Sequence, residues 1–305
     1  MKPTSKPVVF FGSGPVAAAS LRLLAAHCNV EAVITKPAPA HHHGPVPVIE
    51  AATDLGLPLQ LAENKQQLHE LFTEHHFASE LGVLIDFGII VPQPVIDYFP
   101  LGIINSHFSV LPEWRGADPI TFAVLSGQQS TGVSLMLLVE KMDEGPLLAY
   151  GEFELTDTVT TPELTEGLID LSDNLLREIV PGYVQGHVQP MPQSVTERPV
   201  SYSRKLTKDD GLLDWQKPAA VLEREIRAFI AWPKSRGYLG KVESVLTQAA
   251  VVPLTGTPGT LTIVDKSLII YCGEQSLRIE RLKPIGKKEM TGSAFLAGYK
   301  ALLPL

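Results

Sequence analysis

The sequence predicts an α/β protein with a mostly parallel sheet, followed by a small open β-barrel. Two patterns predict these two parts. In the first part of the chain, short apolar runs alternate with helical patterns, a rhythm typical of a parallel sheet that helices cover on both faces. Beyond residue 206, short alternating runs lie between turn glycines, as in small barrels that bind oligonucleotides.

The apolar runs give the order of the elements. Strands are expected at Val8–Phe11, Val30–Ile34, Leu59–Leu61, Gly82–Phe87 and Gly102–Asn105. Helices are expected at Val16–Ala26, Val46–Leu55 and Lys65–Glu74, then after Asp118-Pro119 and after the capping box at Thr160. The carboxyl ends of parallel strands meet at one rim, where open α/β sheets bind their ligands. The first module is therefore expected to be Rossmann-like.

Composition and linker signals give the domain boundaries. The 305 residues are enough for two domains, and 45% apolar content suits buried cores. The segment Gln189–Pro199 holds three prolines and no periodicity, which marks a linker. We expect a catalytic domain at 1–188, a linker at 189–205 and an OB-like β-barrel domain at 206–305. In the last domain, runs at Tyr238–Val252, Gly259–Val264, Ser267–Cys272 and Ser276–Leu282 predict the strands.

Charge differs between the two modules. The whole chain has a net charge of −8, which does not suit a partner that is a polyanion. Residues 1–199 carry 9 Lys and Arg against 23 Asp and Glu, whereas residues 200–305 carry 16 against 10. A basic module of net charge +6 behind an acidic one of −14 favours nucleic-acid binding, and the alternative is a lysine-rich solvated surface.

Location and cofactor class follow from what the sequence lacks. It has no apolar run of about 18 residues, which a membrane span needs. Cys28 and Cys272 are far apart in the sequence, and neither belongs to a cluster with metal-ligand spacing. We therefore expect a cytoplasmic protein that uses no metal. We also expect a monomer, although no pattern in the sequence gives the oligomeric state.

One polar cluster follows the end of a predicted strand. Asn105 and His107 are two residues apart, so their side chains should emerge on the same face. Asp143 comes shortly after the apolar run Val133–Val139, and a carboxylate at the end of a neighbouring strand can orient an imidazole. An amide and an imidazole can stabilise an oxyanion and move protons near neutral pH. A strand-to-helix loop with a core histidine fits the local pattern equally well.

These residues belong to longer motifs. The motifs are NSHFSVLPEWRGADP at Asn105–Pro119, DEG at Asp143–Gly145, LIDFGIIVP at Leu84–Pro92, YSRKLTKDDGLLDW at Tyr202–Trp215 and PIGKKEM at Pro284–Met290. With their spacing they resemble the folate-dependent formyltransferases, and most of all the branch that acts on methionyl-tRNA. The resemblance covers nearly the whole chain.

The resemblance implies a reaction and a set of residues. The formyl group of 10-formyltetrahydrofolate would pass to the α-amine of methionine on initiator methionyl-tRNA, for translation initiation. The implied catalytic residues are Asn105, His107 and Asp143. The implied folate contacts are Ser109, Val110, Leu111 and Pro112, with a pterin-pocket loop at Phe87, Gly88, Ile89 and Ile90. The basic barrel would hold the tRNA, and neither a metal nor a covalent enzyme intermediate is implied.

Two features depart from the family pattern. The family has a long basic loop after the second strand, whereas Lys36–Val46 is short and carries His41, His42 and His43 with one lysine. Glu113 stands where a basic residue is usual. Both changes lower the positive charge near the acceptor stem. Because histidine becomes charged near pH 6.5, we expect tRNA affinity to rise as the pH falls from about 8 to 6.

Three alternatives stay open. Gly12–Ala17 fits the dinucleotide pattern G-x-G-x-x-A, but the second strand ends in Thr35-Lys36 and not in an acid that could hold a ribose. An amino sugar nucleotide is another possible acceptor, since formyltransferases for such substrates share the catalytic motif. The third alternative is a non-catalytic RNA-binding protein, against which the intact Asn105, His107 and Asp143 argue.

Overall fold

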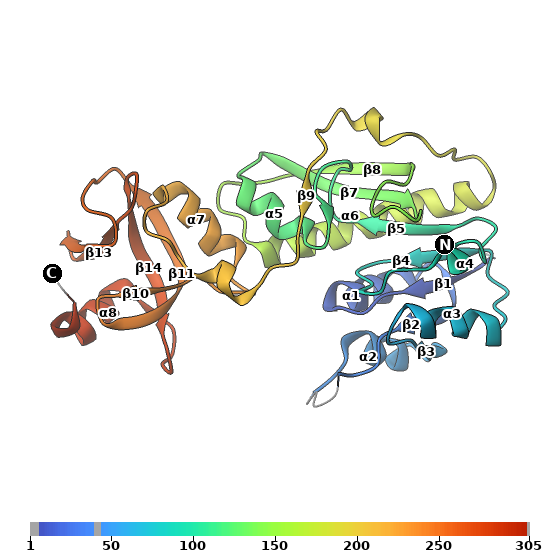
Figure 1. Ribbon diagram of the computed structural model, residues 1–305, viewed down its shortest axis with the longest axis horizontal. Helices are drawn as coiled ribbons and strands as arrows, with labels where there is room; N and C mark the ends of the chain where they lie inside the picture. The colour runs from blue at the N-terminus through green and yellow to red at the C-terminus, as the bar shows by residue number, and fades with distance from the viewer. Residues whose placement is uncertain (1–5, 40–43, 304–305) are drawn as a thin grey trace. The chain divides into compact units, whose positions relative to one another are not determined.

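The chain forms two compact units (Figure 1). The structure is a computed structural model that describes residues 6–39 and 44–303, so His41, His42 and His43 lie outside the described residues. The first unit comprises Met1–Pro119, Ser130–Glu154 and Thr165–Ser203, and the second comprises Ile120–Gln129, Leu155–Leu164 and Arg204–Leu305. Two short stretches from the middle of the chain thus belong to the unit that holds the C-terminal part.

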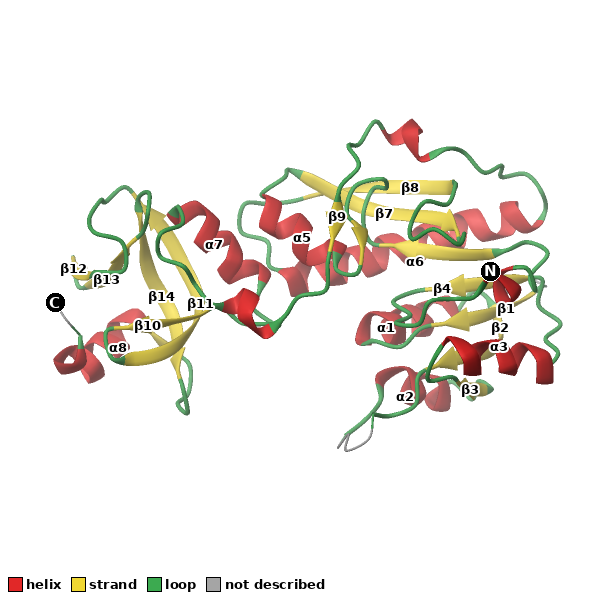
Figure 2. Cartoon of the chain, viewed as in Figure 1, coloured by secondary structure: helices red, strands yellow, loops and turns green. Residues whose placement is uncertain are grey.

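A seven-stranded sheet forms the centre of the first unit, in the order β3-β2-β1-β4-β5-β7-β8 (Figure 2). Its strands are β1 (Pro7–Phe11), β2 (Asn29–Thr35), β3 (Leu59–Leu61), β4 (Leu81–Leu84), β5 (Ile103–His107), β7 (Ser130–Leu137) and β8 (Leu147–Glu154). The strands from β3 to β5 are parallel, whereas β7 and β8 pair antiparallel to their neighbours. The predicted mostly parallel, Rossmann-like sheet is confirmed.

Helices of the first unit pack on a sheet that is apolar on both faces. Contacts join α1 (Pro15–Leu24) to α2 (Pro47–Asp54), and α3 (Lys65–Glu74) to α4 (Gln93–Ile96). Val9 and Phe11 of β1 belong to the same buried cluster as Leu68 and Phe72 of α3. Because side chains alternate along a strand, the buried residues between them face the opposite side. This explains why the sequence of β1 is continuously apolar.

Two further helices begin at the predicted signals. α5 (Pro119–Ser126) starts directly after Asp118, and α6 (Thr161–Val184) starts after Thr160. The capping box of α6 is formed, since the backbone N–H of Thr160 donates to Glu163 Oε2 at 2.9 Å and the backbone N–H of Glu163 donates to Thr160 Oγ1 at 3.5 Å.

The second unit contains a curled antiparallel sheet in the order β10-β11-β14-β13-β12 (Figure 1). Its strands are β10 (Arg236–Leu239), β11 (Val242–Val252), β12 (Leu261–Val264), β13 (Ser267–Tyr271) and β14 (Ser276–Pro284), with β15 (Met290–Thr291) paired to β14. Helices α7 (Ala219–Ala228) and α8 (Gly292–Tyr299) pack on it. The predicted open barrel is confirmed, but its first run is two strands, because Gly240 turns the chain at φ 61°.

The glycine turn after β1 has a packing reason. A Cβ added to Gly14 would lie 2.0 Å from Asp86 Oδ2, and one added to Gly12 would lie 2.5 Å from Ala17 Cβ. The backbone N–H of Ser13 donates to Asp86 O at 3.0 Å. Close approach to the loop after β4 therefore accounts for the glycines of the G-x-G-x-x-A pattern.

Neither cysteine forms a disulfide. Cys28 and Cys272 are buried thiols, and burial raises the pKa of Cys272 to about 11, so this thiol is not a reactive thiolate at neutral pH. In the stretches 6–39 and 44–303, no helix combines the length and the apolar character that a membrane span requires.

Candidate active site

Strand β5 places Asn105 and His107 on one face of the sheet. The strand lies between β4 and β7, where Asn105 pairs with Leu84 on one side and with Met136 on the other. Asn105 is 8% exposed and His107 is 6% exposed. Because side chains alternate along a strand, Ser106 between them points to the other face.

His107 has an acceptor near each ring nitrogen. Nε2 lies 3.0 Å from Trp114 O, and because a carbonyl oxygen can only accept, Nε2 carries a proton and donates to it. Nδ1 lies 3.8 Å from Asp143 Oδ1, which is too long for a hydrogen bond, so the carboxylate acts on the ring through its charge. Both side chains are largely removed from solvent, which reduces the screening of this charge.

The Asn105 carboxamide is available to a ligand. It makes no hydrogen bond to any other residue in the described part of the chain, although the residue is nearly buried. A carboxamide carries two N–H donors, and the Asn105 amide is not one of the fully buried unpaired groups of the described residues, so a ligand can reach it. An oxygen that develops negative charge beside β5 would therefore find a donor in place.

Asp143 reaches His107 because its loop folds back over the sheet. We expected Asp143 to come from the turn after a neighbouring strand, and β7 is a neighbour of β5. Because β7 is antiparallel to β5 and Leu137 pairs with Ile104, β7 ends at the far end of β5 from His107. The loop 138–146 then returns, with Asp143 at φ 53° and its Oδ2 accepting from Gly116 N at 2.7 Å.

Gln193 holds this returning loop, and sequence reasoning missed it. Gln193 is 8% exposed, and its Nε2 donates to Asp143 O at 2.7 Å and to Gly145 O at 2.9 Å. Its Oε1 accepts from Arg115 at 2.6 Å, and Arg115 also lies 3.5 Å from Glu144. The segment was predicted as linker because it has no periodicity, so only its three-dimensional contacts reveal this role.

The segment Ser109–Pro112 is tied into the scaffold. Ser109, Val110 and Leu111 are 0% exposed. All four carbonyl oxygens accept hydrogen bonds, from Ser134 Oγ, Glu113 N, Thr196 Oγ1 and Ser201 N in chain order. The segment therefore fixes the path from His107 to Trp114, and its contact with a folate stays a prediction.

The loop Phe87–Ile90 leaves the sheet at the same end as His107, because β4 and β5 are parallel with Leu84 beside Asn105. Lys36 Nζ donates to Gly88 O at 2.5 Å, and Gly88 N donates to Ser13 Oγ at 3.0 Å. Ile90 is 68% exposed, whereas Ile89 is 9% exposed. A tethered loop that presents an apolar side chain suits contact with a flat aromatic ligand.

Asp86 is an acid at this rim that the sequence did not single out. Its left-handed backbone, at φ 47°, ends the predicted strand Gly82–Phe87 early, at Leu84. The side chain keeps an exposed surface, but the protein atoms around it desolvate the carboxylate and raise its pKa to about 6. Repulsion by Asp118 contributes to the same rise in pKa.

We expect Asp86→Asn to raise the free energy of unfolding above that of the wild type, and by more at pH 7 than at pH 5. The raised pKa means that the folded protein holds this proton more tightly than the unfolded chain, so the free energy of unfolding falls as the pH rises from about 4 to 6. Because asparagine does not titrate, the free energy of unfolding of the variant does not fall for this reason. Denaturant unfolding of both proteins at several pH values measures the difference, which should grow through this window and then level off. A constant difference would show that Asp86 does not titrate there.

Glu113 is buried and paired. It is 8% exposed, and its carboxylate lies 3.8 Å from Arg198, which also pairs with Glu152 at 3.1 Å. Arg198 therefore compensates the negative charge of Glu113 inside the first unit. Glu113 then reduces the positive potential for an acceptor stem less than the sequence suggested.

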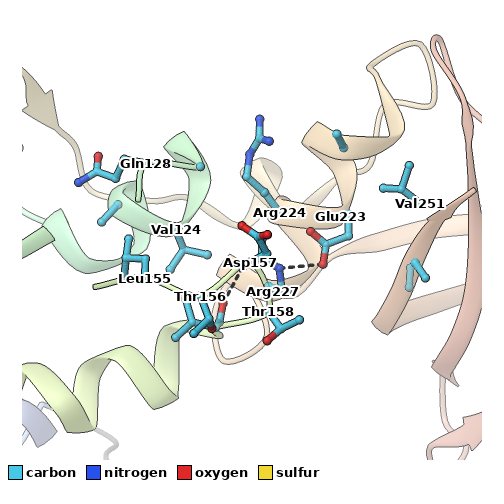
Figure 3. Close-up of a pocket in the computed structure, with 16 residues that line it drawn as sticks. Val124, Gln128, Leu155, Thr156, Asp157, Thr158, Glu223, Arg224, Arg227 and Val251 are labelled. Carbon is cyan, nitrogen blue, oxygen red and sulfur yellow. Dashed lines mark hydrogen bonds and ion pairs between the residues drawn. The ribbon is translucent and has the colours of Figure 1, made fainter. Parts of the chain in front are cut away.

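A separate cavity of about 370 Å³ lies in the second unit (Figure 3). Arg224 and Arg227 of α7 line it; Arg224 Nε donates to Leu125 O at 3.0 Å, and Arg227 donates to Val159 O at 2.6 Å. No predicted site residue lines this cavity. Across residues 6–39 and 44–303, no three His, Cys, Asp or Glu side chains form a group that could hold a metal ion.

The sequence matches a known family over most of its length. Residues 6–180 match the family described as Formyl transferase, and residues 205–300 match Formyl transferase, C-terminal domain. A methionyl-tRNA formyltransferase from Granulibacter bethesdensis is 34% identical, with 96% of this chain and 94% of that protein covered. One from Chloroflexus aurantiacus is 33% identical, with 96% and 97% covered.

A solved structure shares the fold at low identity. The N-formyltransferase from Helicobacter canadensis, solved with folinic acid and dTDP-3-aminofucose, has a TM-score of 0.67 and 15% identity. The likeness covers 92% of this chain and 99% of that one. At this identity it shows the fold and not the substrate.

Proposed function

The chain belongs to the formyl transferase family, and we propose that it transfers the formyl group of 10-formyltetrahydrofolate to the α-amine of methionine on initiator methionyl-tRNA. The observation that carries this proposal is the placement of His107 between Trp114 O and Asp143, with the unpaired carboxamide of Asn105 on the same strand face. Relatives named methionyl-tRNA formyltransferase, at 33–34% identity over 96% of the chain, support this acceptor.

The chemistry needs charge stabilisation and proton movement. The neutral amine attacks the formyl carbon, a new C–N bond forms, and the carbonyl oxygen becomes an oxyanion. Asn105 donates an N–H to that oxygen, and protonated His107 stabilises it by charge. The bond to the folate nitrogen then breaks, the amine loses a proton and the folate nitrogen gains one. His107, oriented by Asp143, passes these protons through water.

The donor would bind at the rim beyond β4 and β5. The loop Phe87–Ile90 offers the exposed side chain of Ile90 to the pterin ring. The buried segment Ser109–Pro112 lies beneath this donor site and supports it. Such a position agrees with the rule that ligands of open α/β sheets bind at the carboxyl ends of the strands.

The acceptor RNA would bind through the basic second unit. Lys287 and Lys288 are exposed in the turn between β14 and β15. Each lysine that contacts a phosphate releases counterions, so binding should weaken steeply as salt rises.

We expect the double variant Lys287→Glu and Lys288→Glu to weaken tRNA binding by about tenfold or more at moderate salt, because two contacts become repulsive. Binding of the formyl-folate should stay unchanged. Titrations with each ligand over a range of salt concentrations measure both. Equal loss of both ligands, or of neither, would contradict a separate RNA-binding unit.

An amino sugar nucleotide is the second candidate acceptor. One observation favours it: the segment Lys36–Val46 has a single fixed cation, Lys36, whose ammonium already donates to Gly88 O. Little positive charge is then left there for an acceptor stem.

A formylation assay tests the proposal. Labelled 10-formyltetrahydrofolate is incubated with the full chain and with charged initiator tRNA, uncharged initiator tRNA or an amino sugar nucleotide. The proposal predicts label only on the charged tRNA. Label on the sugar alone would identify the second candidate, and binding of tRNA without transfer would identify a non-catalytic RNA-binding protein.

A further inference from the structure

The sheet of the second unit has an outer face. Along β10, β11 and β14, the core residues Leu239, Leu246 and Leu282 are 0–1% exposed. Because side chains alternate along strands, residues one or three positions away from these point away from the core, including Ile285 directly after β14. We call the outward set Arg236, Tyr238, Glu243, Lys283 and Ile285 the outer sheet face.

One row of this face carries cations. Arg236 of β10 pairs with Val245 of β11, and Val245 pairs with Lys283 of β14, so the three side chains lie side by side across three strands. Arg236 donates to Lys208 O at 2.7 Å, which fixes its guanidinium near the sheet. The Lys283 side chain is exposed.

The next row carries apolar surface. Tyr238 pairs with Glu243, and Glu243 O accepts from Ile285 N at 3.0 Å, so these three residues are also neighbours. Tyr238 is 62% exposed and Ile285 is 55% exposed. A ring and an aliphatic side chain thus stand in solvent beside a row of cations.

Charges around the face are mostly positive. Lys241 lies in the turn between β10 and β11, and Lys287 and Lys288 lie in the turn after β14; all three are exposed. Glu289 pairs with Arg281 at 2.6 Å, and its charge also acts on Lys283 without an ion pair to it. Glu243 is the acid on the face itself, and such an excess of cations suits a polyanion.

We propose that the outer sheet face binds a single-stranded stretch of the tRNA, with Tyr238 stacked on an unpaired base and Lys283 on a phosphate. The proposal rests on the proposed acceptor. Every base has a flat face that stacks on an aromatic ring, and sheets that present exposed aromatics beside cations bind RNA in this way. Glu243, next to the ring, can accept a hydrogen bond from a ribose hydroxyl.

The first test uses Tyr238→Ala and Tyr238→Phe in the full chain. Loss of one stacked base is expected to weaken tRNA binding about tenfold or more, whereas phenylalanine, which keeps the ring, should bind within about twofold of the wild type. In formylation assays the alanine variant should raise KM for the tRNA and leave kcat and donor binding unchanged.

A second test identifies what the face recognises. A single-stranded RNA oligomer should compete with tRNA for the wild type and lose this ability with Tyr238→Ala, while an RNA duplex of equal length should compete poorly. Lys283→Gln should reduce the salt slope of tRNA binding by about one. Lys266→Gln, in the turn between β12 and β13, is the matched control and should leave the slope unchanged.

Three results would overturn the proposal. The first is equal tRNA affinity of Tyr238→Ala and the wild type. The second is equal competition by the RNA duplex and the single strand. The third is a change in the oligomeric state of the free protein on Tyr238→Ala, which would mark a protein interface. A wild type that does not formylate methionyl-tRNA would instead remove the proposed function. If the wild type formylates methionyl-tRNA and Tyr238→Ala binds the tRNA as tightly as the wild type, only this inference is removed.

Discussion

Asn105→Ala and Asp143→Ala should each lower the turnover of formyl transfer by about two to three orders of magnitude with the fold intact. This is the scale for loss of one oxyanion donor or of one group that supports proton transfer. Asn105 supplies the unpaired donor on β5, and Asp143 supplies the charge 3.8 Å from His107. The measurement is kcat with both substrates saturating, together with thermal unfolding of each variant.

Glu140→Ala is the matched control for Asp143→Ala. Glu140 is an exposed carboxylate in the same loop, 138–146, so its loss removes an equal charge without touching His107. Its turnover should stay close to the wild-type value. Near-normal turnover of Asn105→Ala or Asp143→Ala would remove that residue from the mechanism.

Gln193→Leu should destabilise the protein by about 3 kcal/mol and lower turnover at least tenfold. The change leaves the carbonyl oxygens of Asp143 and Gly145 and one group of Arg115 without their partner, and each unpaired buried group costs about 1–3 kcal/mol. The loop would lose the contacts that hold Asp143 against His107. Denaturant unfolding and kcat measure the two effects.

Gln189→Leu, from the same predicted linker, is the control. Gln189 is exposed and donates to Gly186 O at 3.0 Å at the surface, so its loss should change stability by no more than about 0.5 kcal/mol. If Gln193→Leu lost stability but kept full turnover, the position of the Asp143 loop would not matter for catalysis.

Local signals in the sequence were enough for many elements. The predicted bounds of β3 and α3 agree with the structure to the residue. For α3 the reason is its N-cap: the Asn64 side chain accepts from Gln66 N and Gln67 N, which fixes the first turn. The pairing of Asn105 and His107 on one face also follows directly, since it depends only on the alternation along a strand.

Other features depend on contacts between distant parts of the chain. Periodicity shows that Val133–Val139 is a strand but not its direction, so the sequence did not predict that the loop after β7 folds back to His107. Gln193 has no local pattern, and its role arises from contacts about 50 residues away in sequence. Asp86 becomes notable only because desolvation by the surrounding protein atoms and repulsion by Asp118 raise its pKa.

The most direct test of the account is the ratio of kcat/KM values for two acceptors with the same 10-formyltetrahydrofolate. The acceptors are charged initiator methionyl-tRNA and an amino sugar nucleotide, and the full chain is used at moderate salt. We predict that kcat/KM for the tRNA exceeds that for the sugar nucleotide by at least about 1,000-fold, because the basic second unit adds binding energy only for the RNA. A ratio near one, or a preference for the sugar nucleotide, would contradict the account.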